Sequence, residues 1–453
     1  MRFDRGRGCQ LDTQLNQLTA RDAAAAIRAG EITSEAMVSA CIERIKAREA
    51  TVHAWVNFDA DHALAEARQA DAALSRGDEV GPLHGVPVGL KDIIDTADLP
   101  TESGSRQFAG RRPAQDSACA ALLRAAGAII LGKTVTTEFA LTQARGTTNP
   151  HDPTRTPGGS SSGSGAAVAD FMVQLAVGSQ TGGSVIRPAS FCGTYGYKPT
   201  YGCISRRGVL IISRYLDHLG LYSRSLADLA IMGDVLMQHD EGDFDMRFHP
   251  GCALTDVMDE PTAEVAPKLA FVKGPAWAHA EDHMPAVFEA YVDSLGGIIQ
   301  EVDLAGIFDQ ALDAQATIMN ASLWANLGDW CVQHPDAIED ETKRRVFAGR
   351  DIKASEFIHA TELADSLVRA LDGLFENYDA MVTAAAPGEA PVGLDWTGNA
   401  AFQRIWTLTG LPTLTLPLLQ GPNGMPIGVQ VIGPKGRDGD LFRAARWLDE
   451  TGS

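Results

Sequence analysis

The sequence predicts an α/β protein in which helices cover both faces of a largely parallel sheet. Two helix–strand alternations flank a region rich in glycine and serine at residues 158–163. Residues 116–126 have a helical pattern and precede an apolar strand at 128–131, and a helix including 166–172 precedes a strand at 173–177. Hydrophobic residues make up 45% of the chain and charged residues 21%, as in a globular protein with ample core material. Such alternation usually places a parallel sheet between layers of helices.

Charge argues against several classes of partner. The 453-residue chain carries a net charge of −20. Proteins that bind nucleic acids normally carry a basic stripe, because lysine and arginine displace counterions from phosphates. Arg2, Arg5 and Arg7, together with the pair Arg111–Arg112, are too sparse to form one. We therefore expect no nucleic-acid partner, and an acidic surface also disfavours anionic membranes.

The cysteine pattern and the apolar runs point to a cytoplasmic protein. The cysteines are odd in number and include no C-x-x-C pair, so neither a disulfide framework nor a zinc site is predicted. The first residues lack the apolar core of a signal peptide, and no apolar run approaches the ~20 residues that span a bilayer. The seven cysteines are Cys9, Cys41, Cys119, Cys192, Cys203, Cys252 and Cys331.

Residues 18–77 read as three scaffold helices. Thr19 and Asp22 resemble a capping box ahead of an alanine-rich helix that Gly30 closes. Thr33 can cap a second helix, and the third stops at Gly77.

The chain then turns into a strand at residues 86–91, which ends in Lys91. A lysine among apolar neighbours usually extends its ammonium to solvent. Alternatively, burial lowers its pKa, and a neutral amine becomes available as a base. The residues alone leave both interpretations open.

Residues 127–134, GAIILGKT, match the phosphate-loop pattern G-x-x-x-x-G-K-[ST]. In a phosphate loop the four intervening residues expose backbone N–H groups to the nucleotide. Here they are Ala-Ile-Ile-Leu, which are typical of a buried strand, and no strand precedes Gly127. We therefore expect no nucleotide site.

Residues 158–199 are the centre of the sequence pattern. Two turns of small residues, at 158–163 and 182–184, flank a mostly apolar segment. A flexible linker would continue its glycines and serines and would bury nothing. Glycines beside buried elements permit sharp turns or a close approach to a ligand. These turns are either structural or part of a site.

The motifs of this region resemble the signature of the amidase signature family of serine hydrolases. The resemblance covers residues 18–229 and 400–450, whereas residues 230–400 have only loose similarity. Its motifs are TPGGSSSGSGAAVA (156–169), GSQTGGS (178–184), RPASFCG (187–193), GYKPT (196–200), GVPVGLKD (85–92), GKTVTTEF (132–139), LDHLG (216–220), GLPTLTLP (410–417) and GMPIGVQVIGP (424–434).

The resemblance implies a single large α/β/α domain over residues 1–453, with a mixed, mostly parallel central sheet covered by helices, the amidase signature fold. Motifs scattered from residue 85 to residue 434 belong to one apparent site, so cutting the chain would divide it. Lys133 and Glu138 fit as structural residues near this site. Residues 230–400 are then the variable region in which we expect substrate selection.

A Ser-Ser-Lys triad is implied in place of Ser-His-Asp. None of the eleven histidines has a suggestive context, no G-x-S-x-G elbow is present, and His84 and His218 read as ordinary polar neighbours. In the triad, Ser184 would form the acyl-enzyme, and Ser160 would relay protons between Ser184 and Lys91.

The family pattern also implies groups that support the triad. The serine that matches Ser160 follows a cis peptide bond, here Gly159–Ser160, and Ser161 would support the triad by hydrogen bonding. No metal or cofactor is required. The backbone N–H groups of Thr181, Gly182, Gly183 and Ser184 would form the oxyanion hole, where side chains in place of the two glycines would block the carbonyl.

The sequence departs from the common family pattern at several positions outside the triad. Arginine is usual two residues after the nucleophile, but here Val185 and Ile186 precede Arg187. The other departures are Gln180, where an acidic residue is frequent, Tyr215 and Leu221 around the LD motif, and Thr407, where asparagine is common. These differences prevent a transfer of substrate preference from well-known members.

Three functions are compatible with the motifs. The first is a stand-alone amidase, a monomer or homodimer, that hydrolyses small apolar or aryl amides, with aryl esters and carbamates (urethanes) as further candidate substrates. The second is the A subunit of a tRNA-dependent amidotransferase, which works as a glutaminase in a complex. The third is a binding protein with a decayed site, which the intact triad disfavours.

The loop at 203–216 bears on the choice of substrate. It is either a buried strand with solvated ends or a mobile lip over an apolar pocket walled by Trp324 and Trp330. The second interpretation predicts uncharged aryl or alkyl acyl groups, with anilides and aryl carbamates preferred over peptides and glutamine.

Overall fold

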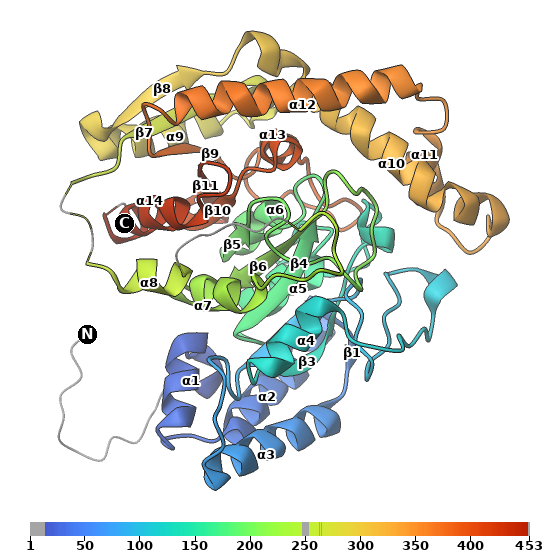
Figure 1. Cartoon of the computed structure of the whole chain (residues 1–453), viewed down its shortest axis with the longest axis vertical. Coiled ribbons are helices and arrows are strands. Elements are labelled where there is room, and N and C mark those ends of the chain that lie inside the picture. Colours follow the sequence, from blue (N-terminus) through green and yellow to red (C-terminus); the bar gives the residue numbers. More distant parts are fainter. Residues whose placement is uncertain (1–13, 247–252, 262, 264, 452–453) are drawn as a thin grey trace.

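Eleven strands form one mixed sheet at the centre of the molecule (Figure 1). The computed structural model describes residues 14–246, 253–261, 263 and 265–451, so Arg2, Arg5, Arg7, Cys9 and Cys252 lie outside the described residues. The strand order is β1-β3-β2-β4-β6-β5-β10-β11-β9-β7-β8. The bounds are β1 (Trp55–Phe58), β2 (Pro87–Lys91), β3 (Ile129–Thr134), β4 (Leu175–Gln180), β5 (Tyr195–Lys198), β6 (His218–Ser223), β7 (Leu269–Lys273), β8 (Ile299–Asp303), β9 (Ala380–Ala384), β10 (Thr413–Gln420) and β11 (Pro426–Ile432).

The α/β class and the mixed sheet are confirmed, but parallel pairing is less frequent than expected. Strand β2 runs parallel to β3 and β4, and β7 runs parallel to β8 and β9. The other six pairings are antiparallel. The expectation rested on the helix–strand alternations before residue 180, where it holds. Beyond them, β10 and β11 are joined by a short turn, and strands joined in that way run antiparallel.

The three helices expected over residues 18–77 are present. Thr19 Oγ1 accepts the N–H of Asp22 at 3.0 Å, Thr33 caps the second helix, and Gly77 ends the third with φ of 77°. The α-helices are α1 (Ala20–Arg28), α2 (Ser34–Val52), α3 (Ala60–Arg76), α4 (Ala118–Ala125), α5 (Ser162–Ala169), α6 (Ile186–Cys192), α7 (Leu226–Leu236), α8 (Leu254–Asp259), α9 (Met284–Leu295), α10 (Ala311–Gln333), α11 (Asp340–Phe347), α12 (Ala354–Leu374), α13 (Ala401–Thr409) and α14 (Asp438–Thr451).

Neighbouring residues on β5 show how helices cover both faces of the sheet. Successive side chains of a strand point to opposite faces. A Cβ at Gly196 would lie 2.5 Å from Ala189 on α6, whereas the ring of Tyr197 packs edge-on against Phe442 on α14. Helices α6 and α14 therefore lie on opposite faces, and Gly196 allows α6 to approach closely.

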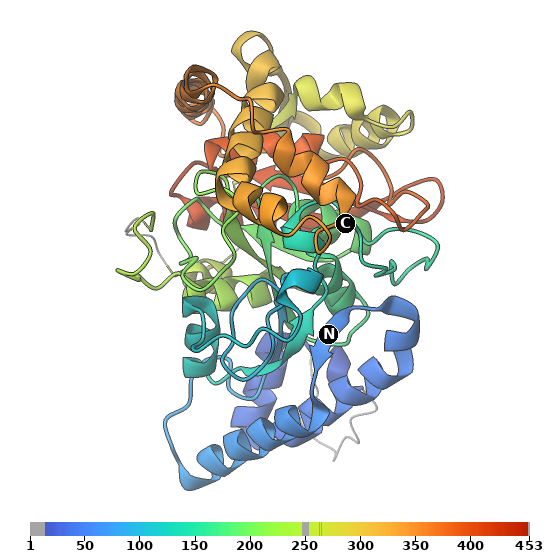
Figure 2. The same cartoon turned by 90° about the vertical axis from the view of Figure 1, so that its right-hand side faces the viewer.

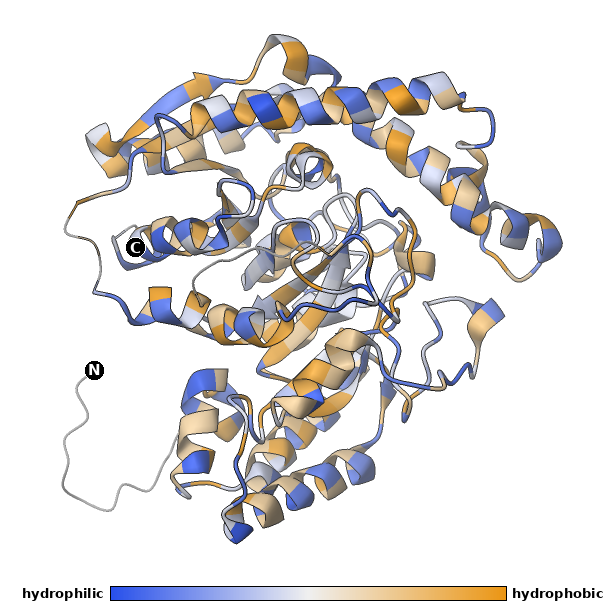
Figure 3. Ribbon diagram, viewed as in Figure 1, coloured by the Kyte–Doolittle hydropathy of each residue, from blue (hydrophilic) through white to orange (hydrophobic). Residues whose placement is uncertain are grey.

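Helices α1–α3 lie at one end of the long axis and α10–α12 lie toward the other (Figures 1 and 2). The helices at both ends carry hydrophilic and hydrophobic residues side by side, as Figure 3 shows for α3 and α12. In α12 the buried side chains are Ala360, Leu367 and Leu371. No helix in the described part of the chain is long and apolar enough to span a bilayer.

The phosphate-loop lookalike is a buried strand, as expected. Residues 129–134 form β3, and the Nζ of Lys133 lies 2.6 Å from both the carbonyl oxygen of Ile94 and the Oγ1 of Thr101. Burial lowers the pKa of Lys133 to about 8, although the carboxylate of Asp92, 3.6 Å away, favours the charged form. A lysine committed in this way cannot bind a nucleotide.

Candidate active site

Lys91 ends β2 with its side chain completely buried. Its Nζ donates to the Oγ of Ser160 at 2.7 Å and to the Oγ of Ser179 at 2.8 Å. Burial holds the pKa of Lys91 well below its usual value, and the charge of Asp217 only partly opposes this shift. The neutral form is therefore favoured, and of the two interpretations of Lys91 the buried amine is the one observed.

Ser160 stands just before α5, after a cis Gly159–Ser160 peptide bond. Gly159 is required there, because a Cβ would lie 2.6 Å from the Cγ2 of Thr397. The next residue, Ser161, accepts the N–H of Ser179 and donates to its carbonyl oxygen, both at 3.2 Å. Ser161 thus holds Ser179, and Ser179 in turn accepts a hydrogen bond from Lys91.

Ser184 lines a cavity of about 220 Å³. Residues 181–184 form one side of the cavity, and residues of α10, α11, α13 and the 396–400 loop contribute the others. The hydroxyl of Tyr222 donates to the backbone carbonyl of Ser184 at 3.0 Å and fixes that backbone from beneath. The Ser184 hydroxyl makes no hydrogen bond to a described residue, so it is free to meet a ligand.

The backbone N–H groups of Thr181, Gly182, Gly183 and Ser184 also have no acceptor among the described residues. The two N–H groups that follow, of Val185 and Ile186, are both bound by the Oε1 of Gln180, at 2.9 and 3.1 Å. Four adjacent donors beside a free serine hydroxyl have the arrangement needed to hold a developing oxyanion.

The two glycines of this turn have different structural roles. A Cβ at Gly183 would lie 2.4 Å from the Oε1 of Gln403, so packing alone excludes a side chain there. At Gly182 the nearest atom would be 3.9 Å away, and the added group would face the cavity. The expectation that side chains would block the carbonyl therefore applies to Gly182, whereas Gly183 is explained by packing.

Sequence reasoning did not assign roles to Ser179, Asp217 and Gln315, which brace the site. Ser179 contacts Lys91, and the Oγ1 of Thr181 donates to the buried carboxylate of Asp217 at 2.6 Å. Gln315 on α10 donates to the carbonyl of Thr181 at 3.0 Å, so the region 230–400 contacts the turn at residues 181–184 directly. Ser179 could have been found from the strand register, because β4 runs parallel to β2 and both end at the site.

Two of the departures from the family pattern are in direct contact. The Nε2 of Gln180 donates to the Oγ1 of Thr407 at 3.0 Å, and Thr407 donates to the carbonyl oxygen of Gly182 at 2.7 Å. Neither residue bonds to a triad side chain, as the sequence suggested. Both nevertheless hold the turn that carries the four free N–H groups.

The loop at 203–216 differs from both expectations. It contains no strand beyond an isolated bridge between Ile94 and Val209, and none of its residues lines the cavity at Ser184. Its arginines form ion pairs with the acidic segment 240–245, for example Arg206 with Asp245 at 2.7 Å.

Trp324 and Trp330 do not wall the cavity either. Trp324 packs against Phe347, with ring centroids 5.4 Å apart, and Trp330 packs against Phe108 at 5.3 Å. Trp324 packs against the apolar cluster that contains Leu323 and Leu327, and Trp330 is partly exposed. The apolar pocket expected from these tryptophans is therefore not found at Ser184.

The two histidines beside the signature motifs and one acidic cluster are engaged in other contacts. His84 and His218 bond to the backbone carbonyls of Ala70 and Leu216. A cluster of His62, Glu66 and Asp98 has the donor types of a cation site, but the guanidinium of Arg124 binds both carboxylates at 2.5 Å.

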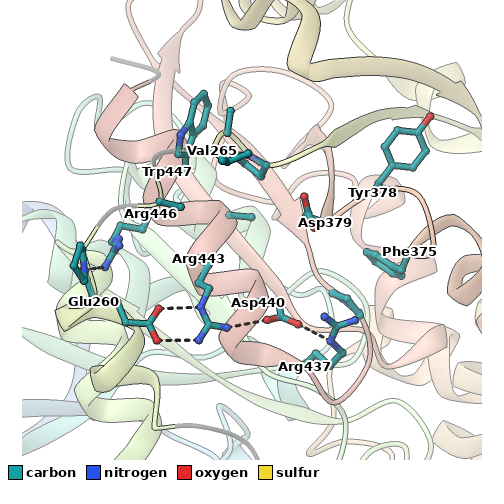
Figure 4. Close-up of a pocket in the computed structure, with 16 residues that line it drawn as sticks. Glu260, Val265, Phe375, Tyr378, Asp379, Arg437, Asp440, Arg443, Arg446 and Trp447 are labelled. Atoms are coloured by element: carbon teal, nitrogen blue, oxygen red, sulfur yellow. Dashed lines mark hydrogen bonds and ion pairs between the residues drawn. The ribbon is translucent and has the colours of Figure 1, made fainter.

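A second pocket lies beside α14, and none of Lys91, Ser160 and Ser184 lines it (Figure 4). Its charged side chains bond to one another: Glu260 to Arg443 at 3.0 Å, Arg443 to Asp440 at 2.9 Å, and Asp440 to Arg437 at 2.5 Å. No nucleophile accompanies them, so the cavity at Ser184 is the candidate active site.

Comparisons with known proteins identify the family of the chain. The amidase family model matches residues 36–442. The A subunit of the glutamyl-tRNA(Gln) amidotransferase of Chloroflexus aurantiacus is 34% identical, over 95% of this chain and 96% of the relative.

Solved structures show the same fold. A chain from a vestigial protein complex, described as revealing the evolutionary origins of an s-triazine catabolic enzyme, matches with a TM-score of 0.89 at 26% identity, over 96% of this chain and 99% of that one. The peptide amidase of Stenotrophomonas maltophilia matches with a TM-score of 0.82 at 26% identity, over 96% and 97%. The chain therefore belongs to the amidase signature family, and it is a hydrolase of carbon–nitrogen bonds.

Proposed function

We propose that the protein hydrolyses amides through an acyl-enzyme on Ser184, with Ser160 and Lys91 as the other members of a Ser-Ser-Lys triad. The observation that carries this proposal is the contact between Lys91 and Ser160, 2.7 Å long and completely buried, beside a cavity lined by Ser184. A neutral lysine can accept a proton that a hydroxyl relays from the nucleophile.

In the first step the Oγ of Ser184 attacks the amide carbonyl and passes its proton through Ser160 to the neutral Nζ of Lys91. The N–H groups of residues 181–184 bind the negative oxygen that forms. The same proton then returns through Ser160 to the leaving nitrogen, and the carbon–nitrogen bond breaks to give the amine and the acyl-enzyme. Water repeats the sequence on the ester and releases the acid.

A hydrolysis screen of amides, aryl esters and carbamates tests this proposal, with intact-mass detection of the acyl-enzyme. We expect acylation of the wild type and none of Ser184→Ala, a change that removes one oxygen atom from the cavity wall. A fluorophosphonate should likewise label the wild type only. Equal labelling of the Ala variant would exclude Ser184 as the nucleophile.

A second candidate function is supported by the sequence comparisons. Relatives at 33–34% identity are A subunits of glutamyl-tRNA(Gln) amidotransferases. On that hypothesis the chain would act as a glutaminase within a complex. We favour the stand-alone hydrolase, as a monomer or homodimer, because the 230–400 region and the GGSVIRP segment diverge. Gel filtration of the purified chain with a glutaminase assay separates the two functions.

A further inference from the structure

Three arginines line the cavity at Ser184 without a carboxylate partner. They are Arg187 on α6, Arg345 on α11 and Arg404 on α13. None of them forms an ion pair with a described carboxylate, although the charge of Glu341 acts on Arg345 and that of Asp313 acts on Arg404. Arg187 is 4% exposed; it donates to the carbonyl of Gly159 at 2.5 Å and to Thr397 at 3.2 Å, and its Nε has no partner among the described residues.

Many arginines elsewhere on the molecule form ion pairs, in contrast to these three that share one cavity. A fourth arginine of the cavity, Arg344, binds both oxygens of Glu341, at 2.8 and 2.6 Å, so the carboxylate that lines this cavity already has an arginine partner. In the pocket of Figure 4 acidic and basic side chains alternate in contact. The chain has 58 acidic residues and 38 basic ones. The lack of a carboxylate beside these three arginines therefore does not reflect a shortage of acidic residues.

Keeping these cations together has an electrostatic cost. Burial lowers the pKa of Arg187 to about 9, and the charge of Arg404 adds to this shift. Burial also lowers the pKa of Arg404, with the charge of Arg345 as the next cause, while the charge of Asp313 opposes both. Clustered and partly desolvated cations are stabilised when an anion joins them.

We propose that Arg345 and Arg404 bind a carboxylate of the substrate, with Arg187 adding to the positive potential around Ser184. A guanidinium can hold both oxygens of a carboxylate at once, which gives orientation as well as affinity. The proposal rests on the hydrolase function proposed above and names its substrate class: amides that carry a carboxylate. It replaces the uncharged aryl substrates that the sequence favoured.

The same cluster disfavours substrates that also carry an ammonium group. Glutamine and glutaramate have the same carbon chain, carboxylate and amide, and differ in the α-ammonium of glutamine. Three unmatched guanidinium groups repel that ammonium, and Glu341 is already bound by Arg344. We therefore expect glutaramate to be hydrolysed faster than glutamine, the opposite of what a glutaminase requires.

The test compares kcat/KM for matched substrates on one preparation of the full chain. Glutaramate, succinamate and adipamate carry the carboxylate on the acyl side, and N-acetyl-β-alanine carries it on the amine side. Pentanamide, butanamide, hexanamide and N-propylacetamide are their neutral counterparts. We expect at least one anionic amide to exceed its neutral counterpart by roughly 10- to 100-fold. Neutral amides hydrolysed as well as all the anionic ones would overturn the proposal.

Variants of Arg345 and Arg404 test whether these two residues cause the preference for anionic amides. Arg345→Gln and Arg404→Gln should each lower the ratio of anionic to neutral kcat/KM by roughly tenfold or more. Arg404→Lys keeps the charge but loses the two-point contact, and it should lie between Arg404→Gln and the wild type. Arg350→Gln, which removes an exposed charge just after α11, is the matched control and should leave the ratio unchanged. Equal ratios in all the variants would assign the preference elsewhere and overturn the proposed site.

Binding to Ser184→Ala separates failure of this inference from failure of the proposed function. Calorimetry should detect glutaramate binding to that variant and weaker binding after Arg404→Gln is added. Binding without hydrolysis by the wild type would support the carboxylate site and count against the hydrolase mechanism. Hydrolysis of neutral amides, with no binding of any of the four anions, would support the mechanism and overturn the carboxylate site.

Discussion

The Nζ of Lys91 lies 2.7 Å from the Oγ of Ser160, and both side chains are completely buried. The lysine comes from the end of β2 and the serine from the residues just before α5, so the contact depends on the parallel pairing of β2 and β4 beneath that helix. A charged ammonium enclosed in this way is costly, and burial therefore favours the amine. This form is the one that a proton-accepting role needs.

Activity should be lost in acid as Lys91 becomes protonated. Its pKa lies well below the usual value because of burial, so the lysine is neutral above that lowered pKa and charged below it. We expect kcat/KM to fall as pH decreases through this pKa, measured with a substrate that does not itself titrate. Lys91→Ala should remove this acid limb and most of the activity. A wild-type profile that stays flat into acid would contradict a lysine base.

Ser179 should affect the pH at which activity is lost in acid, because it contacts Lys91, without exchanging a proton in the reaction. Its Oγ accepts a hydrogen bond from Lys91 at 2.8 Å, and such a contact favours the charged ammonium. Ser179→Ala should lower the pKa of Lys91 further, move the acid limb to lower pH and reduce kcat by about tenfold through poorer positioning. An unshifted limb combined with lower stability would indicate a purely structural serine.

The fold was predictable where local signals agree with the tertiary structure. Thr19, Thr33 and Gly77 mark helix ends through their own hydrogen bonds or backbone conformation, and these ends were placed correctly. The antiparallel half of the sheet was not anticipated, because the direction of β5, β6 and β10 depends on long-range pairing, such as Thr413 opposite Lys198. No periodicity in the sequence encodes that partner.

The site was predictable only where the residues lie in compact motifs. Lys91, Ser160 and Ser184 each stand in a recognisable segment, and the structure brings Lys91 and Ser160 together and places Ser184 on the adjoining cavity. The cavity arginines escaped notice because Arg345 and Arg404 stand on separate helices with no shared motif. The loop at 203–216 was misjudged because its arginines pair with acidic residues at 240–245, a segment that no local pattern connects with the loop.

Replacing the side-chain nitrogen of Gln180 by oxygen should disrupt its contact with Thr407. Gln180→Glu restores the acidic residue that is frequent at this family position, but it removes the Nε2 donor to Thr407 and places a carboxylate in a buried site. Thr407 would then donate to the new carboxylate and release the carbonyl of Gly182. We expect a loss of about 1–3 kcal/mol in the free energy of unfolding, measured in urea, together with lower kcat. Unchanged stability and kcat would show that the contact is dispensable.

The two glycines of the oxyanion turn should give opposite results when each is changed to alanine. In Gly183→Ala the new methyl group would lie 2.4 Å from the Oε1 of Gln403 and 3.0 Å from the Cβ of Ala400. Gln403 is buried and Ala400 is half-buried, so we expect a loss of roughly 1–3 kcal/mol in the free energy of unfolding from overpacking.

Gly182→Ala should instead leave the free energy of unfolding within about 1 kcal/mol of the wild type, because the nearest atom to its methyl group would be 3.9 Å away. That methyl group faces the cavity beside four N–H groups, where it would hinder a carbonyl oxygen, so kcat/KM should fall at least about tenfold. Urea denaturation and steady-state kinetics on both variants provide the comparison. An active Gly182→Ala enzyme would place the oxyanion outside this turn, whatever the stability of Gly183→Ala.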